Sequence, residues 1–131
     1  MTSRILALEK DLFFSVKIRD TLQHYEMNVT TTRTLPAFEQ QIMADEKPAL
    51  VIVNTATKGV DWESAIRLAK AKSILVLAFG SHMDLEARAK ALQAGATKVV
   101  ANSKFTSDMV GLVTRMLGSS VDIAANADEE E

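Results

Sequence analysis

Polar residues follow two apolar runs of this 131-residue sequence, and they are the first candidates for chemistry. Glu9 and Lys10 come directly after the run 4–8, and Asn54 follows five consecutive apolar residues, 49–53. Successive apolar positions indicate a strand covered on both faces, as in parallel α/β sheets. Functional groups in such sheets lie at the carboxyl ends of the strands, so Asn54 occupies the position at which chemistry would occur.

These residues do not form a catalytic set. Asn54 does not ionise and is a poor nucleophile, while Glu9 and Lys10 alone supply no nucleophile with a base and an orienting group. The absence of cysteine excludes disulfides and thiolate chemistry, and the two histidines are too few for an ordinary zinc site. We therefore expect no enzyme activity, no metal centre and no cofactor.

A small-ligand sensor remains open as an alternative function. Flavin or nucleotide binding favours a loop rich in glycine, serine and threonine after the first strand, and Glu9-Lys10-Asp11-Leu12 is a poor one. The loop 55–59, Thr-Ala-Thr-Lys-Gly, is a better candidate because it combines hydroxyls, a cation and a flexible glycine. A nucleotide-type ligand would then occupy the crevice at the carboxyl ends of the first and third strands.

The elements that position these residues follow from the apolar periodicity. Strands are predicted at 4–8, 27–32, 47–54, 74–78 and 98–101, and helices at 12–25, 36–44, 62–69, 85–94 and 107–117. The helix 12–25 has a core-facing stripe of Phe14, Ile18, Leu22 and Tyr25. The alternation predicts an α/β fold of three αβα layers around a doubly wound five-stranded parallel sheet of order 2-1-3-4-5.

The composition, 47% hydrophobic and 24% charged, suits one globular domain. We expect this domain over residues 1–118 and an acidic, disordered tail over 119–131. Residues 1–118 carry 15 bases against 12 acids, an excess too small to argue for nucleic acid. No run approaches the roughly 20 apolar residues of a membrane span. The expectation is a cytoplasmic protein that contacts neither nucleic acid nor membrane.

Several motifs resemble the receiver domain of bacterial response regulators, the CheY-like superfamily, over residues 4–117. Residues 94–100, Ala-Gly-Ala-Thr-Lys-Val-Val, resemble the family's Ala-Gly-Ala-Asp-Asp-Tyr-Leu run before the fifth strand. Residues 47–54, Lys-Pro-Ala-Leu-Val-Ile-Val-Asn, resemble its Lys-Pro-Asp-Leu-Ile-Ile-Leu-Asp strand. Gly59-Val60-Asp61 falls where the family often has Gly-Met-Asp.

The resemblance implies a degenerate site. Receiver activity uses a carboxylate pair that binds Mg²⁺, a phosphoacceptor aspartate, a hydroxyl and a lysine. The matching residues here are Glu9, Lys10, Asn54, Ala78 and Asn102. Only Glu9 keeps its charge type, and asparagine cannot form an acyl phosphate. The resemblance thus implies a pseudo-receiver without a phosphoacceptor site, in which a Glu9–Lys10 contact replaces the metal.

Two surfaces are candidates for contacts with another signalling protein or a second copy. Phe13 and Val16 point away from the core stripe of the first helix, which suggests a partner or dimer patch. By analogy with receivers, the face of the fourth helix, fifth strand and fifth helix is the other candidate. It carries Arg88, Lys90, Lys98, Val99 and Lys104, a mild positive bias that would attract an acidic partner. The predicted function is a non-phosphorylatable receiver-like adaptor.

Overall fold

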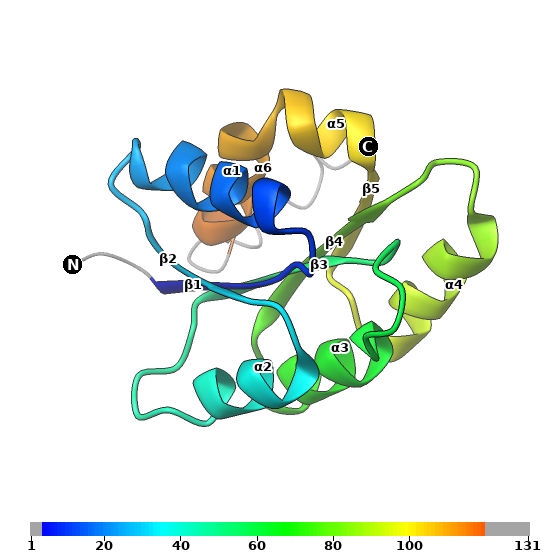
Figure 1. The fold of residues 1–131 in the computed structure, drawn as a ribbon, viewed down its shortest axis with the longest axis horizontal. Coiled ribbons are helices and arrows are strands. Elements are labelled where there is room, and N and C mark those ends of the chain that lie inside the picture. The colour runs from blue at the N-terminus through cyan, green and yellow to red at the C-terminus, as the bar shows by residue number, and fades with distance from the viewer. Residues whose placement is uncertain (1–3, 120–131) are drawn as a thin grey trace.

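The computed structural model describes residues 4–119. Five strands alternate with six helices: β1 (Arg4–Leu8), α1 (Leu12–Gln23), β2 (Asn28–Thr32), α2 (Leu35–Ile42), β3 (Leu50–Asn54), α3 (Trp62–Ala71), β4 (Leu75–Gly80), α4 (Leu85–Ala94), β5 (Lys98–Ala101), α5 (Asn102–Ser107) and α6 (Met109–Ser119). All neighbouring strands pair in parallel, in the order β2-β1-β3-β4-β5. Figure 1 shows α1, α5 and α6 on one face of the sheet and α2, α3 and α4 on the other. The predicted three-layer fold is confirmed.

The central strands are buried on both faces, as their continuous apolar runs predicted. Along β3, Leu50 and Ile52 pack into the core beneath α1, α5 and α6, whereas Val51 and Val53 pack beneath α2, α3 and α4. Side chains alternate between the faces of a strand, so each run must supply two cores at once. This requirement explains why β1, β3 and β4 have almost no polar residue before their carboxyl ends.

Helix boundaries follow capping chemistry. Asp11, Thr34, Asp61 and Asp84 each precede a helix, and each side chain accepts a hydrogen bond from the backbone N–H three residues on. The α4 helix ends at Gly95 in the left-handed conformation (φ 117°), as predicted for a C-terminal cap. The four N-terminal caps fix where the loops at the carboxyl edge of the sheet end, whereas Gly95 begins a loop at the opposite edge.

Two predicted boundaries are wrong in ways that affect the site. The β4 strand continues to Gly80, so Ala78 lies two residues before its end, fully buried and paired with Val53. The predicted helix 107–117 corresponds to α6, but the prediction missed the short helix α5 before it, which is separated from α6 because Asp108 leaves the helical conformation (φ −138°, ψ 38°). The short α5 is anchored by Phe105, whose ring stacks on Phe79 at a centroid distance of 4.0 Å.

The predicted stripe of α1 is only partly buried, and α4 buries its small residues in place of its large apolar ones. Tyr25 is 57% exposed, because α1 ends at Gln23 and only the earlier stripe residues reach the core. On α4 the buried face is made of alanines (Ala87, Ala91 and Ala94), while Leu85 is 71% exposed and Leu92 is 47% exposed. The small alanine face lets α4 pack closely against α3 and leaves larger side chains outside.

The predicted acidic tail lies outside the described residues, except for Ser119 at the end of α6. None of the helices in residues 4–119 combines the length and the hydropathy that a membrane span requires.

Candidate functional site

An open crevice of about 590 Å³ borders the carboxyl ends of β1 and β3. Its walls come from the loops that follow β1, β2 and β3, which meet at this edge because the three strands are parallel neighbours. The lining residues are Glu9, Lys10, Asp11, Leu12, Phe13, Arg33, Asn54, Ala56, Thr57 and Lys58. Three of the predicted site residues, Glu9, Lys10 and Asn54, are therefore brought together.

The carboxylate of Glu9 is buried at the base of this crevice, with 2% of the residue exposed. Its Oε1 accepts a hydrogen bond from Asn54 Nδ2 at 2.8 Å, and its Oε2 accepts one from the backbone N–H of Asp11 at 3.1 Å. Asn54 Oδ1 in turn accepts from the Ala56 N–H at 2.8 Å. Because the Ala56 N–H needs an oxygen as its acceptor, the NH₂ end of the Asn54 amide must face Glu9.

The same contacts determine the electrostatics of Glu9. Burial raises the pKa of the Glu9 carboxyl, and the hydrogen bonds from Asn54 and the Asp11 N–H oppose that rise. An amide at position 54 therefore supplies a hydrogen-bond donor where an aspartate would supply a second negative charge. The Asn54 side chain satisfies the buried acid without any cation.

This donor set does not fit the Mg²⁺ site that the resemblance implies. Mg²⁺ requires octahedral oxygen coordination, usually with one or two carboxylates. Both oxygens of Glu9 already accept hydrogen bonds, and Asp11 is engaged in capping α1 through the Phe14 N–H. Within residues 4–119, no group of three histidine, aspartate or glutamate side chains is placed to hold a metal ion.

The expected contact between Glu9 and Lys10 is wrong. The ammonium of Lys10 donates to the backbone carbonyl of Lys58 at 3.2 Å, and no ion pair joins it to Glu9 in the part of the chain that is described. Asn54 takes the place that Lys10 was expected to fill, because it reaches the buried carboxylate while Lys10 remains exposed.

Ala78 and Asn102 do not join the crevice. Ala78 lies in the core, and Asn102 is an exposed first residue of α5 whose carbonyl accepts from Thr106 Oγ1. The residue at the end of β4 is Gly80, and a Cβ there would overlap the hydroxyl of Thr55. Thr55 Oγ1 donates to the Phe79 carbonyl at 3.3 Å. The hydroxyl beside the end of β4 thus comes from the residue after β3.

A second hollow of about 250 Å³ lies between the β4–α4 loop and β5. Its wall includes Gly80, Leu85, Arg88 and Val99, and Arg88 donates to the Val99 carbonyl at 2.9 Å. Val99 stands at the family's aromatic position and is only partly buried. The structure thus joins two residues of the predicted contact face in one wall.

The predicted patch of Phe13 and Val16 is placed differently. Phe13 is 89% exposed, but Val16 is half-buried, and the exposed apolar neighbour of Phe13 is Leu12 at 56%. Leu12 and Phe13 both line the crevice. Sequence reasoning also missed Arg33, although it directly follows β2 and the same strand-end rule would have identified it.

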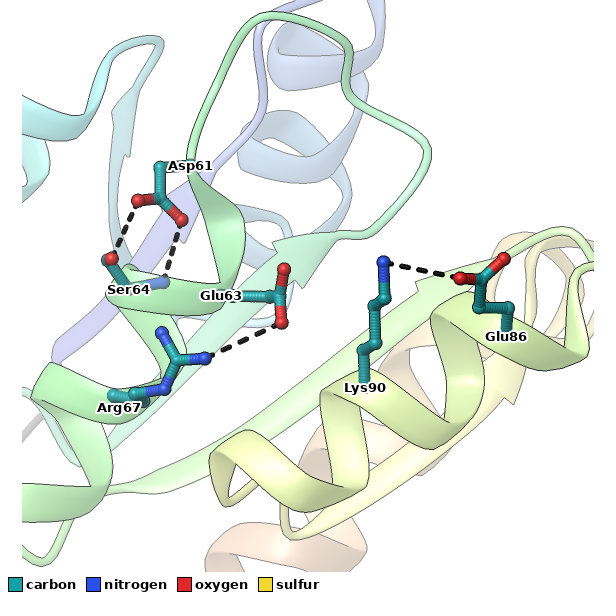
Figure 2. A network of polar contacts seen from close by, with 6 residues as sticks. All are labelled: Asp61, Glu63, Ser64, Arg67, Glu86 and Lys90. Carbon is teal, nitrogen blue, oxygen red and sulfur yellow. Dashed lines mark hydrogen bonds and ion pairs between the residues drawn. The ribbon is translucent and has the colours of Figure 1, made fainter.

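Two of the cations predicted on the other face are paired with acids of their own helices or helix ends. Lys90 pairs with Glu86 at 3.5 Å and Lys104 with Asp108 at 3.6 Å. Figure 2 shows the Lys90–Glu86 pair on α4, with Lys90 on the side nearer to Glu63 of α3. The less expected feature of this face is apolar, because Met83, Leu85 and Leu92 are all exposed there.

No protein-family model matches the sequence, and the search of curated proteins gave no match. Solved structures do match. NtrX from Brucella abortus superimposes with a TM-score of 0.82 at 16% identity, over 99% of this chain and 30% of that chain. A CheY-like response regulator receiver domain protein from Methanospirillum hungatei gives 0.81 at 14% identity, over 95% of this chain and 100% of that one. The chain has the receiver fold.

A third receiver-fold neighbour, described as an adenylate cyclase from Rhodopirellula baltica, gives a TM-score of 0.79 at 16% identity over 100% of both chains. The present receiver fold spans about 30% of the length of the NtrX chain. TM-scores of 0.79–0.82 at identities of only 14–16% establish a shared fold and no shared function. What the crevice can do depends on its own residues.

Proposed function

We propose that this receiver-fold chain is a signalling module that works without phosphorylation of residue 54 and acts through contact with another protein. One observation carries the proposal: the amide of Asn54 is hydrogen-bonded to Glu9 and to the Ala56 N–H, at the position where a receiver has its phosphoacceptor. An amide cannot attack a phosphoryl donor to form an acyl phosphate.

The rest of the crevice supports the same function. Gly80, the last residue of β4, has no side chain, and Asn102, which follows β5, has no charge, so neither of these two positions supplies a group that would engage a phosphoryl group. The crevice also offers no nucleophile activated by a neighbouring base. A regulatory role therefore fits these residues better than a catalytic one.

The face formed by α4, β5 and α5 is the proposed contact surface. Exposed apolar side chains rimmed by charged ones are typical of protein–protein contact sites. Leu85 and Leu92 supply the apolar part, and the predicted residues Arg88, Lys90, Lys98, Val99 and Lys104 come from the same three elements. The proposed partner is another signalling protein with an apolar centre and an acidic rim.

An amide NMR titration tests whether the pocket is chemically silent. Mg²⁺ is added first, and then Mg²⁺ with beryllofluoride, a mimic of the acyl phosphate. We expect no saturable shifts at Glu9 or Asn54 in the natural chain. The Asn54→Asp variant serves as the comparison, because it restores a carboxylate at this position. Saturable shifts around residue 54 of the natural chain would overturn the proposal.

A further inference from the structure

Three cations from three different loops converge on the crevice. Arg33 Nε donates to the Lys10 carbonyl at 2.9 Å, and Lys10 Nζ donates to the Lys58 carbonyl at 3.2 Å. These two bonds tie the loops after β2, β1 and β3 to one another. The side chains of Arg33 and Lys10 are thereby held on a neighbour's backbone carbonyl and not on an acid, and Lys58 lines the same crevice.

The acids of the crevice do not neutralise this cluster. Glu9 is buried and accepts from Asn54 and the Asp11 N–H, and Asp11 caps α1. Within residues 4–119, none of the three cations takes part in an ion pair. Three cations thus face two acids across the crevice with no ion pair between them among the described residues, and this excess of positive charge favours the binding of an anion.

The remaining lining residues indicate what else the ligand carries. Leu12 and Phe13 place exposed apolar surface beside the cations, and the ring of Phe13 is 89% exposed. The wall also contains the Thr57 hydroxyl, which is buried without a hydrogen-bond partner in the described part of the chain. An apolar surface with a few polar groups, in a crevice of about 590 Å³, is typical of small-molecule sites.

We propose that this crevice binds a phosphorylated small molecule that carries a planar ring. The phosphate lies among Lys10, Arg33 and Lys58, and the ring rests against Phe13. This binding is non-covalent and uses no group at position 54, so it is independent of whether the crevice can be phosphorylated. It gives the crevice a ligand where the proposed function gives it none.

The test is an NMR and calorimetric titration of the whole chain with AMP and ADP as probes. Adenosine supplies the ring without phosphate, and inorganic phosphate supplies the anion without a ring. We expect saturable shifts with the nucleotides at Lys10, Phe13, Arg33 and Lys58, weaker binding of phosphate, and the weakest binding of adenosine. Because the contacts are ionic, the affinity should fall as salt is added.

Paired variants separate a built site from general charge. The double variant Arg33→Gln/Lys58→Gln should weaken AMP binding by about tenfold or more, because each substitution removes a charge-assisted hydrogen bond to the phosphate. The matched control, Arg19→Gln/Arg67→Gln, removes the same charge from two side chains that are paired with Asp20 on α1 and Glu63 on α3 (Arg67 and Glu63 in Figure 2), and should bind AMP as the natural chain does. Phe13→Ala should weaken AMP but leave inorganic phosphate unchanged.

Three outcomes would overturn the proposal. Neither AMP nor ADP produces saturable shifts at millimolar concentration, or adenosine binds as well as AMP, or the two double variants lose affinity equally. None of these results bears on the beryllofluoride titration, because that experiment reads residue 54 and this one reads the three cations.

Discussion

The side-chain amide of Asn54 bridges the buried carboxylate of Glu9 and the backbone N–H of Ala56, at 2.8 Å on each side. Glu9 accepts a hydrogen bond from the NH₂ end of the amide, whereas the Ala56 N–H donates one to its oxygen end. No ionised residue can satisfy both at once. The neutrality of position 54 is therefore part of how the crevice is held together.

The Asn54→Asp variant should lower stability at neutral pH. Aspartate keeps the acceptor for the Ala56 N–H but places a second carboxylate 2.8 Å from Glu9. We expect the free energy of unfolding to fall by about 2–3 kcal/mol, the range for a lost hydrogen bond to a charged group. Urea denaturation measures this, and added Mg²⁺ should recover part of the loss. Asn102→Asp, at an exposed site, is the control and should change stability little.

Glu9 should make the free energy of unfolding fall as the pH rises, which is opposite to the usual effect of an acidic residue. Burial raises its pKa above the ordinary value of 4.5, so the folded state binds this proton more tightly than the unfolded state does. Its contribution to stability is fully present below the unfolded-state pKa and is lost as the pH rises through the higher folded-state pKa. Relative to Glu9→Gln, which does not titrate, the natural chain should lose stability as the pH rises from about 4 towards neutrality.

Urea denaturation of both proteins across that range measures the difference, in which the contributions of other groups cancel. In the Asn54→Asp background the trend should be steeper, because a nearby like charge raises the pKa of Glu9 further. This account of the Glu9 carboxyl would be contradicted if the stability difference between the natural chain and Glu9→Gln stayed constant, or grew in favour of the natural chain, as the pH rises.

Gly80→Ala should be destabilising for a reason that a second substitution removes. The added Cβ would overlap Thr55 Oγ1, so we expect a loss of about 1–3 kcal/mol from overpacking. Thr55→Ala removes that oxygen and leaves an ordinary contact of 3.5 Å to the Thr55 Cβ. The double variant should therefore be more stable than the sum of the single effects by about 1 kcal/mol or more.

A double-mutant cycle by urea denaturation measures this coupling. Gly118→Ala is the control, because a Cβ at Gly118 meets nothing within 4 Å and alanine favours a helix over glycine. Strictly additive effects at positions 55 and 80 would show that the two side chains do not compete for one space.

The α4 helix buries alanines and exposes leucines, which predicts how substitutions on its two faces affect stability. Leu85→Gln and Leu92→Gln should change the free energy of unfolding by no more than about 0.5 kcal/mol, as expected for exposed positions. Ala91→Leu should cost about 1–3 kcal/mol, because Ala91 is fully buried against the core. Thermal or urea unfolding of the three variants tests this, and a large loss at either leucine would mean that α4 packs through its other face.

The fold was predictable because its strongest signals are local. Continuous apolar runs identified β1, β3 and β4, and the short connections left few ways to order a parallel sheet. Gly95 marked the end of α4 because few other residues tolerate a φ of 117°. The face of α4 was not predictable from periodicity, since leucines and alanines recur there with the same helical spacing.

The site was predictable only as far as strand ends could be located. Glu9, Lys10 and Asn54 were placed correctly because their strands end where the apolar runs end. Ala78 was misplaced because β4 continues to Gly80, whose space is filled by a side chain from a different strand end. Likewise, no local pattern could show that Asn54 and not Lys10 would reach Glu9, a contact between residues 45 positions apart.

The packing of Thr55 against Gly80 also limits how this chain can change by mutation. A side chain at position 80 is sterically blocked while Thr55 Oγ1 occupies its space, so the first step toward a hydroxyl on β4 must occur at position 55. That first step alone removes the hydrogen bond to the Phe79 carbonyl and gains nothing in return. The order of substitutions is therefore constrained, and a hydroxyl at position 80 cannot be reached by single steps that each preserve stability.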